Sequence, residues 1–189
     1  MPALVFVATV LSVGLVSDLY RLDRRTARIT RLTHGARLAE PDVSPDGLRV
    51  AAIRISNGER RLVVIDRAAL DAGGASATRA LTTAVVFGTP GDIMATPRWS
   101  PDSTRIAVEA RRLHDWSSIT VFDVDDPGRG GADVAAVPGR VATPAWTPDG
   151  RAIVYAEAPA GVPFNLTCVH LDHVGATRSI GQLAGGARS

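Results

Sequence analysis

A short turn motif recurs three times along this chain and constrains its fold more than any other feature. Each copy begins with Ser or Thr, continues with Pro-Asp, ends in Gly or Ser, and precedes an apolar run. Pro presets φ, Asp accepts bonds from nearby backbone amides, and Gly tolerates positive φ, so each copy predicts a tight hairpin turn. The turn residues are Ser44, Pro45, Asp46, Gly47, Ser100, Pro101, Asp102, Thr147, Pro148, Asp149 and Gly150. Because Ser103 replaces Gly in the second copy, we expect that turn to avoid positive φ.

Strand-like segments follow each turn in the same order. Short runs rich in β-branched residues predict a second strand at 50–53, 106–108 and 153–156. A third strand that ends in Asp follows at 62–66, 119–123 and 168–172, and a weaker fourth strand follows at 78–82, 132–137 and 177–183. Four strands per unit, repeated every 40 to 50 residues or roughly so, are typical of propeller blades. The sequence therefore predicts an all-β chain of four-stranded antiparallel blades.

The N-terminal residues fit the same repeat. Asp23 ends a segment equivalent to the other third strands, which makes 3–8 a second strand and 29–33 an outer strand. A secretory signal is the alternative, but no positive charge precedes the apolar run and no cleavage pattern closes it. The run is also too short for a membrane span. We expect a single domain over 1–189, with a partial blade at 1–34, full blades at 35–84, 95–139 and 140–186, and a surface loop at 85–94.

Three of these motifs carry a resemblance to a known family. Ser-Pro-Asp-Gly at 44–47, Asp-Leu-Tyr-Arg-Leu-Asp at 18–23 and Arg-Leu-Thr at 31–33 resemble the TolB-like, WD-repeat-like β-propellers. The resemblance implies a non-catalytic scaffold that binds another protein, of unknown identity, and it favours a periplasmic location. It equally allows a second interpretation, in which the chain is the substrate-gating propeller of a prolyl-oligopeptidase-like serine hydrolase whose catalytic domain lies outside this chain.

The number of blades raises a question of its own. About three full blades and a partial one are predicted, whereas propellers usually have roughly four to eight, and closure covers the sheet edges. The chain is then either a fragment of a larger propeller or a small open one. In both cases we expect open blade edges that favour self-association.

Charge gives little support for a nucleic-acid partner. The formal net charge is +2, and all 21 basic side chains are Arg, scattered along the chain. The densest run, 21–31, has few aromatic neighbours on which bases could stack. We therefore expect no nucleic-acid binding and no membrane span.

No reactive motif stands out. The chain has no nucleophile elbow, zinc-binding His-Glu-x-x-His or phosphate-binding glycine loop, so we predict no enzyme activity, no catalytic residue, no cofactor and no metal. Cys168, His170 and Asp172 alternate, which would place them on one face of a strand, although a lone Cys in such a strand is more often a small core residue. His114 and Asp115 belong to a predicted loop, and polar side chains that are exposed to solvent are common in loops.

Other recurring residues predict structural roles. Trp99 and Trp146 occupy the same position before their turns, with Val43 at the matching place in the first copy, and should pack between blades. The aspartates that end the third strands should cap the turns into the fourth strands. They are Asp23, Asp66, Asp123 and Asp172.

Overall fold

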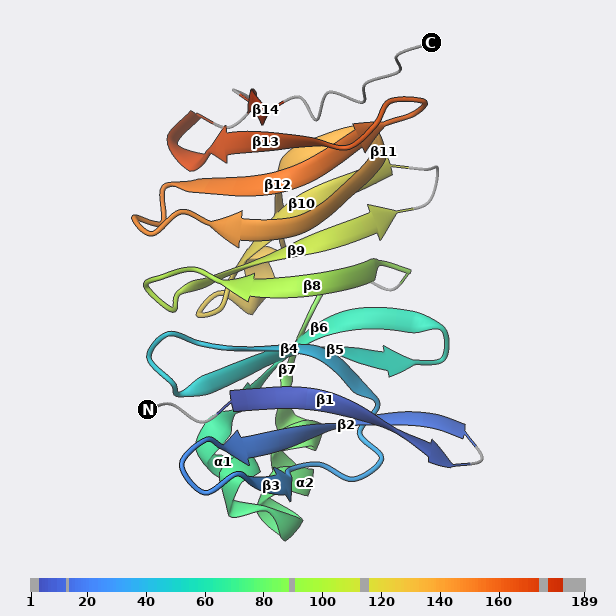
Figure 1. Cartoon of the computed structure of the whole chain (residues 1–189), viewed down its shortest axis with the longest axis vertical. Coiled ribbons are helices and arrows are strands. Elements are labelled where there is room, and N and C mark those ends of the chain that lie inside the picture. The colour runs from blue at the N-terminus through green and yellow to red at the C-terminus, as the bar shows by residue number, and fades with distance from the viewer. Residues whose placement is uncertain (1–3, 13, 89–90, 113–115, 174–176, 182–189) are drawn as a thin grey trace.

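Stacked antiparallel blades, each formed by consecutive strands, make up most of the chain (Figure 1). The computed structural model describes residues 4–12, 14–88, 91–112, 116–173 and 177–181. Blade 1 contains β1 (Leu4–Ser12), β2 (Gly14–Asp23) and β3 (Arg28–Arg31). Blade 2 contains β4 (Leu38–Val43), β5 (Arg49–Ser56), β6 (Glu59–Asp66) and β7 (Val85–Phe87).

The last two blades share a strand. Blade 3 contains β8 (Ile93–Trp99), β9 (Arg105–Arg112), β10 (Trp116–Asp123) and the first half of β11 (Ala132–Trp146). Blade 4 contains the second half of β11, then β12 (Ala152–Pro159), β13 (Asn165–His170) and β14 (Thr177–Gly181). Short 3-10 helices follow β10 and β13, η1 (Pro127–Arg129) and η2 (Leu171–His173).

Two kinds of link join the blades through their backbones. Strand β11 pairs with β10 up to Pro138 and with β12 from Gly139 onward, so one strand serves two blades. Blades 2 and 3 are joined by a parallel bridge between Arg60 and Ile93. The predicted architecture is confirmed, since three four-stranded blades and a three-stranded one form an open β-propeller.

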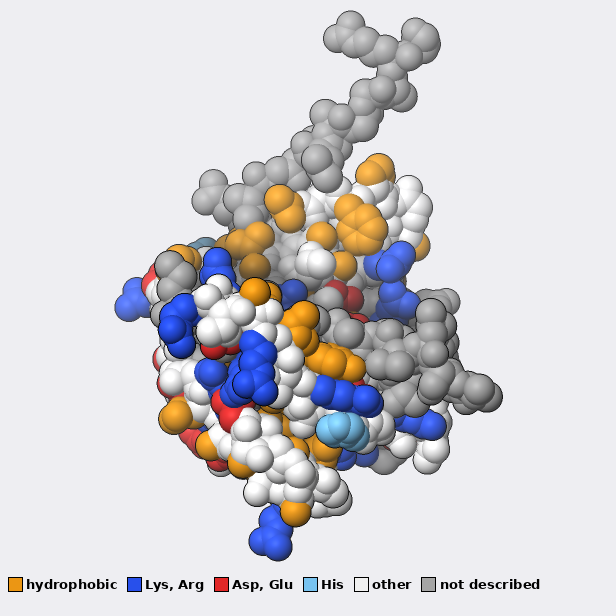
Figure 2. Space-filling view, turned by 60° about the horizontal axis from the view of Figure 1, so that its bottom comes forward, with side chains coloured by type: hydrophobic (Ala, Val, Ile, Leu, Met, Phe, Trp, Pro, Cys, Tyr) orange, Lys and Arg blue, Asp and Glu red, His pale blue; other side chains and the backbone are white. Residues whose placement is uncertain are grey.

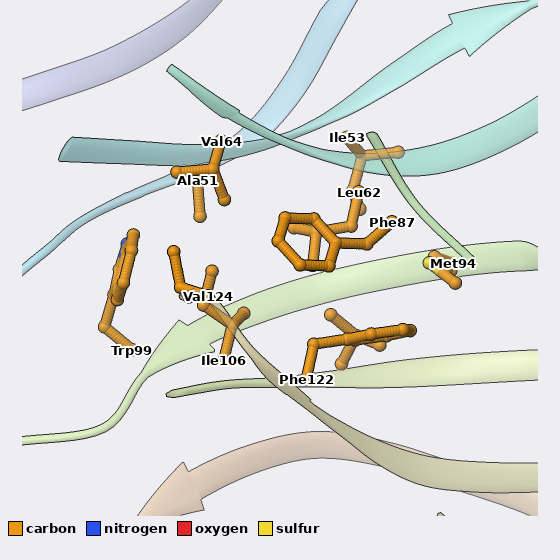
Figure 3. Close-up of a cluster of buried hydrophobic side chains, with 11 residues drawn as sticks. Ala51, Ile53, Leu62, Val64, Phe87, Met94, Trp99, Ile106, Phe122 and Val124 are labelled. Carbon is orange, nitrogen blue, oxygen red and sulfur yellow. The ribbon is translucent and has the colours of Figure 1, made fainter. Parts of the chain in front are cut away.

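Apolar side chains fill the spaces between successive blades. Figure 3 shows the cluster between blades 2 and 3, where the Phe87 and Phe122 rings meet edge to face with centroids 5.4 Å apart. A second cluster joins blades 1 and 2 through side chains such as Leu19 and Ile65, and a third joins blades 3 and 4 through Ile119 and others. The alternating strand residues therefore bury both faces of blades 2 and 3, as a propeller requires.

Blade 2 departs from the predicted strand pattern. The segment 78–82 is not a strand but lies in a helix, because α1 (Arg67–Ala72) and α2 (Gly74–Thr83) follow β6. The Ala-rich sequence favours a helix, and Asp66 starts α1 by accepting a bond from the Ala69 amide at 3.0 Å. The fourth strand is β7, in the segment predicted as a loop, whose Val-Val-Phe sequence suits a strand. Both predictions were wrong.

A buried aspartate holds the connection between blades 1 and 2. Asp18 has no exposed surface, and its two carboxylate oxygens accept four hydrogen bonds. The donors are Arg31 Nη2 (2.6 Å), Thr33 Oγ1 (2.8 Å), Gly35 N (3.1 Å) and Ala36 N (3.0 Å). The side chain thus fixes the path by which the chain leaves β3 and enters β4.

The helices of this structure are short and lie together. Among the described residues, no helix is both long and apolar enough to span a membrane. The two helices lie at one end of the stack, beside β3 (Figure 1). The blade repeat does not account for these two helices.

Candidate functional site

The repeated turns are closed by their own side chains. The hydroxyl at the first turn position donates to the aspartate at the third, and the same carboxylate accepts a backbone amide two residues later. In the first copy Ser44 Oγ lies 2.5 Å from Asp46 Oδ1, and Leu48 N lies 2.9 Å from it. Asp102 and Asp149 have equivalent contacts. The hydroxyl donors lower the pKa of each aspartate, and the contacts are local to each hairpin.

Ser103 adopts the conformation that its sequence was expected to avoid. Its φ is +63°, close to the +73° of Gly47 and the +68° of Gly150, so the prediction was wrong. A left-handed conformation costs a non-glycine residue about 1 to 2 kcal/mol. The structure shows the compensation, because Ser103 Oγ accepts the Asp46 amide of the preceding blade at 3.0 Å. The Ser103 hydroxyl thus forms a contact between blades 2 and 3.

Two substitutions at Ser103 separate strain from this contact. Ser103→Ala keeps the left-handed strain and loses the bond, so the free energy of unfolding should fall by about 1 to 2 kcal/mol. Ser103→Gly loses the bond and also relieves the strain, so its effect should stay within about 0.5 kcal/mol of zero. Urea denaturation measures both variants, and a larger loss for Ser103→Gly than for Ser103→Ala would contradict the assignment.

An arginine and a tryptophan clamp neighbouring blades together. The Arg49 guanidinium lies 5.2 Å from the centroid of Trp99, and its Nη2 donates to the Ser103 carbonyl at 2.7 Å. One blade further on, Arg105 lies 4.9 Å from Trp146 and donates to the carbonyl of Gly150. Each indole also donates back to the preceding blade, at Asp42 O and Arg98 O. The tryptophans thus lie between blades, as their recurrence predicted.

The second clamp can be tested by a double-mutant cycle. Arg105→Ala should lower the free energy of unfolding by about 1 to 2 kcal/mol, because a stacked cation and a hydrogen bond are lost together. With Trp146→Leu as the second substitution, we expect a coupling of about 1 kcal/mol. The exposed Arg151→Ala is the matched control and should change stability by less than about 0.5 kcal/mol. Additive losses at Arg105 and Trp146 would show that the clamp does not stabilise the stack.

The inner strands carry polar groups that the sequence reasoning did not single out. Glu40, Thr96 and Thr143 occupy the same position in β4, β8 and β11, at a register shift, and each has a positive φ between 45° and 52°. The Thr96 amide donates to Glu40 Oε2 at 2.5 Å, and the Thr143 amide donates to Glu109 Oε1 at 2.7 Å. The sequence signal that could have identified these three residues is their equivalent position in the repeat.

These contacts tie β8 to β4 and β11 to β9, in each case to a strand of the preceding blade. Arg60 forms an ion pair with Glu40, and Thr96 Oγ1 donates to Glu109 Oε1. A neighbouring carboxylate, Asp42, accepts the Trp99 amide at 2.8 Å, and burial raises its pKa. These carboxylates receive hydrogen bonds from strands of the following blade, and so they connect blades 2, 3 and 4.

The cysteine and histidine candidates do not form one site. Strand β13 ends at His170 and the chain turns into η2, so Asp172 leaves the strand and the predicted common face with Cys168 is wrong. Cys168 is free and half-buried, and His34 is exposed. His114 and Asp115 lie outside the described residues. Within the part of the chain that the structure describes, no three His, Cys, Asp or Glu side chains are placed to hold a metal ion.

Three of the four strand-ending aspartates accept backbone amides just after their strands. Asp23 Oδ1 accepts from Arg25 N at 2.9 Å, and Asp123 Oδ1 accepts from Asp125 N at 3.0 Å. Asp66 caps α1 instead of a turn into a strand. The predicted capping role is thus confirmed for Asp23 and Asp123, was wrong for Asp66, and stays a prediction for Asp172.

An exposed aromatic surface surrounds the crossover from blade 3 to blade 4. Trp116, Arg140 and Phe164, here called the crossover patch, lie around residues 138–140. The side chains of Trp116 and Phe164 are 51% and 37% exposed, and the Arg140 guanidinium lies 5.8 Å from the Phe164 ring centroid. Trp116 pairs with Pro138 in the ladder. The patch therefore combines two aromatic rings and a cation at one place on the surface.

The backbone beneath this patch is held rigidly. Ser117 Oγ donates to the Gly139 carbonyl at 2.8 Å, and the Ala160 amide donates to the Pro138 carbonyl at 3.1 Å. Exposed Val162 and Leu166 flank Phe164, at 48% each. Rigid, exposed aromatic and arginine side chains are the groups that most often dominate binding between proteins.

Comparisons with known proteins agree with the fold. No protein-family model matches the chain, and no curated protein matches its sequence. The structure is similar to TolB from Acinetobacter baumannii, with a TM-score of 0.65 and 16% identity over 87% of this chain and 37% of that one. It is also similar to a puromycin-hydrolyzing peptidase from Mycobacterium tuberculosis (TM-score 0.65, 18% identity, 94% of this chain, 30% of that one).

A third similar structure is the β-propeller domain of the trilobed protease from Pyrococcus furiosus, which has an open velcro topology. The TM-score is 0.64 at 13% identity, over 94% of this chain and 53% of that domain. The chain thus spans between 30% and 53% of the length of these three structures. The fold defines the chain as a β-propeller. More particularly, its blades are TolB-like, and at these identities the likeness concerns the fold alone.

Proposed function

We propose that this chain is a non-catalytic scaffold that binds another protein through the crossover patch. The observation that carries the proposal is the exposure of Trp116 and Phe164 beside Arg140 on a rigid backbone. Exposed aromatic side chains that cluster in this way mark interaction surfaces more often than scattered apolar residues do. The repeated turn residues, by contrast, serve hairpin structure, since their polar groups bond within or between blades.

The charge around the patch favours an acidic partner surface. Arg140 is exposed at this end of blades 3 and 4. A partner with carboxylates around an apolar centre would pair with this arginine while it covers the two rings. The TolB-like fold supports this role, because its loops present side chains on two faces without a reactive centre of their own.

An affinity capture with matched variants tests the scaffold proposal. The wild-type chain and the Trp116→Ser/Phe164→Ser double variant are immobilised and exposed to lysate of the source cells, and bound proteins are quantified by mass spectrometry. Leu48→Ser is the control, because Leu48 is 65% exposed in a turn at the opposite end of the strands. We expect at least one protein to bind the wild type and the control but not the double variant. Equal recovery on all three, or no specific protein at all, would refute the proposal.

A second function is supported by one specific comparison. The similarity to a puromycin-hydrolyzing peptidase covers 94% of this chain. In this alternative the chain is the propeller part of a serine hydrolase and screens the substrates of a separate catalytic domain. Sequencing the gene beyond both ends of this chain decides the point. A hydrolase domain with a Gly-x-Ser-x-Gly motif in the same reading frame would establish the alternative. In-frame stop codons directly on both sides of this coding sequence would exclude it.

A further inference from the structure

The helical insertion in blade 2 creates a cavity of its own. A pocket of about 730 Å³ lies between α2, the end of β6 and the segment after β10, and its lining includes Val64, Ser76, Val85 and Val124. This volume is within the range of small-molecule sites, roughly 300 to 1,000 Å³. Figure 2 shows the helical end of the molecule, where basic and apolar side chains are interspersed among others.

The periodicity of α2 explains why the space is open. Ser76 and Ala80 lie one turn apart on α2, and both line the pocket together with Ala84, which follows the helix. Their short side chains leave the wall of the pocket shallow, and Ala77, Ala80 and Ala84 also pack against the cluster between blades 1 and 2. The cavity is thus a consequence of which face of the helix carries short side chains.

The helices are anchored independently of anything that fills the pocket. Arg54 Nη2 donates to the Leu81 carbonyl at 2.5 Å, near the C-terminal end of α2. Asp71 ties α1 to blade 1 through Arg21 Nη1, at 2.9 Å. Leu70 of α1 is fully buried. Since these contacts lie away from the cavity, the pocket keeps its shape when empty, and a ligand would not have to order it.

The lining combines an apolar floor with basic groups. Val64 and Val124 are almost fully buried, and Arg49 and Arg79 lie at the sides together with the hydroxyl of Ser76. The single acidic residue in the lining, Asp66, is engaged as the N-cap of α1. The pocket therefore carries a net positive charge, which favours an anion and disfavours a cation.

One of the arginines has a contact that a ligand could replace. Arg49 Nη1 lies 3.3 Å from Asp125 Oδ1, and the Asp125 side chain is 74% exposed. An ion pair with so exposed a partner contributes little. A carboxylate inside the pocket would meet the same guanidinium in a less solvated place, where charge-assisted hydrogen bonds are stronger.

We propose that this pocket binds an organic anion, such as a carboxylate with an apolar body. The apolar part lies on the valine floor, and the carboxylate receives hydrogen bonds from Arg79, Arg49 and Ser76. The site is distinct from the crossover patch and does not depend on the scaffold function, because it is formed by the helical insertion in blade 2.

Fluorescence titration with anilinonaphthalene sulfonate, an apolar anion, tests the site directly. Arg79→Gln removes a charge and Ser76→Phe fills the space, and each should weaken binding about tenfold. Both side chains are exposed on α2, so the fold should be retained, which circular dichroism checks. The controls are Arg151→Gln, in a turn of blade 4, and Ser56→Phe, at the end of β5, and both should bind as the wild type does. Equal affinity in all five proteins would overturn the proposal, since the dye would then be binding at open blade flanks.

A competition experiment establishes the required charge. Octanoate and octylammonium share one apolar tail and differ in the sign of the head group. Octanoate should displace the bound dye from the wild type and should compete about tenfold more weakly against the Arg79→Gln variant. If octylammonium displaced the dye as well as octanoate does, the pocket would be an apolar cavity without anion selectivity, and the proposal would be wrong.

Discussion

Replacing Asp18 with Ala is expected to lower the free energy of unfolding by about 3 to 5 kcal/mol, the largest loss among the substitutions considered for this chain. The carboxylate accepts bonds from one guanidinium, one hydroxyl and two backbone amides. Without it, the amides of Gly35 and Ala36 lose their partners, and each unsatisfied buried donor costs about 1 to 3 kcal/mol. Chemical denaturation of the two proteins measures the difference.

Two further variants test whether this effect belongs to the buried site. Asp18→Asn keeps the shape but not the charge, so its loss should be smaller than that of Asp18→Ala. Asp23→Ala removes a half-buried aspartate that accepts two backbone amides, and it should have a much smaller effect. If Asp18→Ala and Asp23→Ala were equally destabilising, the buried contacts would not be what holds blade 1 to blade 2.

The same site makes stability depend on pH in acid. Burial alone would raise the pKa of Asp18, but the hydrogen bonds from Ala36, Thr33, Arg31 and Gly35 together outweigh it and hold the pKa below its ordinary value of 3.8. A depressed pKa contributes stability that is fully present above 3.8 and is lost as the pH falls through the lower, folded value. Asp18→Asn should therefore show a weaker fall in stability on acidification than the wild type.

Gly139→Ala is expected to lower the free energy of unfolding by about 2 to 4 kcal/mol, the second largest effect. Gly139 lies in β11 at the crossover between blades 3 and 4, with a φ of +139°. A Cβ there would lie 2.3 Å from the Ala158 carbonyl oxygen and 2.9 Å from the Pro159 Cα. Both obstacles are backbone atoms of β12, so β11 and β12 would have to separate.

Gly161→Ala is the matched control for that substitution. Its φ is +79°, and a Cβ there would meet nothing within 4 Å, so conformational strain is added without a clash. The expected loss is about 1 to 2 kcal/mol. Thermal and urea unfolding of both variants would separate the two effects. Equal losses would mean that the contact with β12 relaxes freely and that strain alone matters.

The repeat made most of the blades predictable. The turn residues, the Asp-ending third strands and the recurring Trp99 and Trp146 all occur in phase, so a single motif located strands in every blade. Even the partial first blade followed from the distance of Asp23 to the expected turn. This periodicity can be seen in a single sequence because each blade has the same strand order and packs equivalent residues against its neighbours.

The departures from the repeat were not predictable in the same way. Helix α2 took the place of an expected strand because its alanines favour a helix, a local preference that does not follow the repeat, and because Ala77 and Ala80 pack between blades 1 and 2. Ser103 adopts a glycine-like conformation because of a hydrogen bond from Asp46, a residue 57 positions away. The crossover patch escaped notice for a similar reason, since Trp116, Arg140 and Phe164 become neighbours only after β11 has crossed between blades.

The shared strand also bears on how the molecule resists opening. Because β11 runs from blade 3 into blade 4 without a break, the two blades are joined by one continuous strand, and the Ala160 amide of blade 4 also donates to the Pro138 carbonyl of blade 3. Blades 2 and 3 have a single bridge at Arg60 and Ile93, and otherwise depend on side chains and clamps. We therefore expect blades 3 and 4 to open together and blade 2 to separate from them more easily. The rates of amide hydrogen exchange should accordingly change at β8. The crossover patch lies over the shared strand, and it therefore belongs to the part of the molecule that we expect to open last.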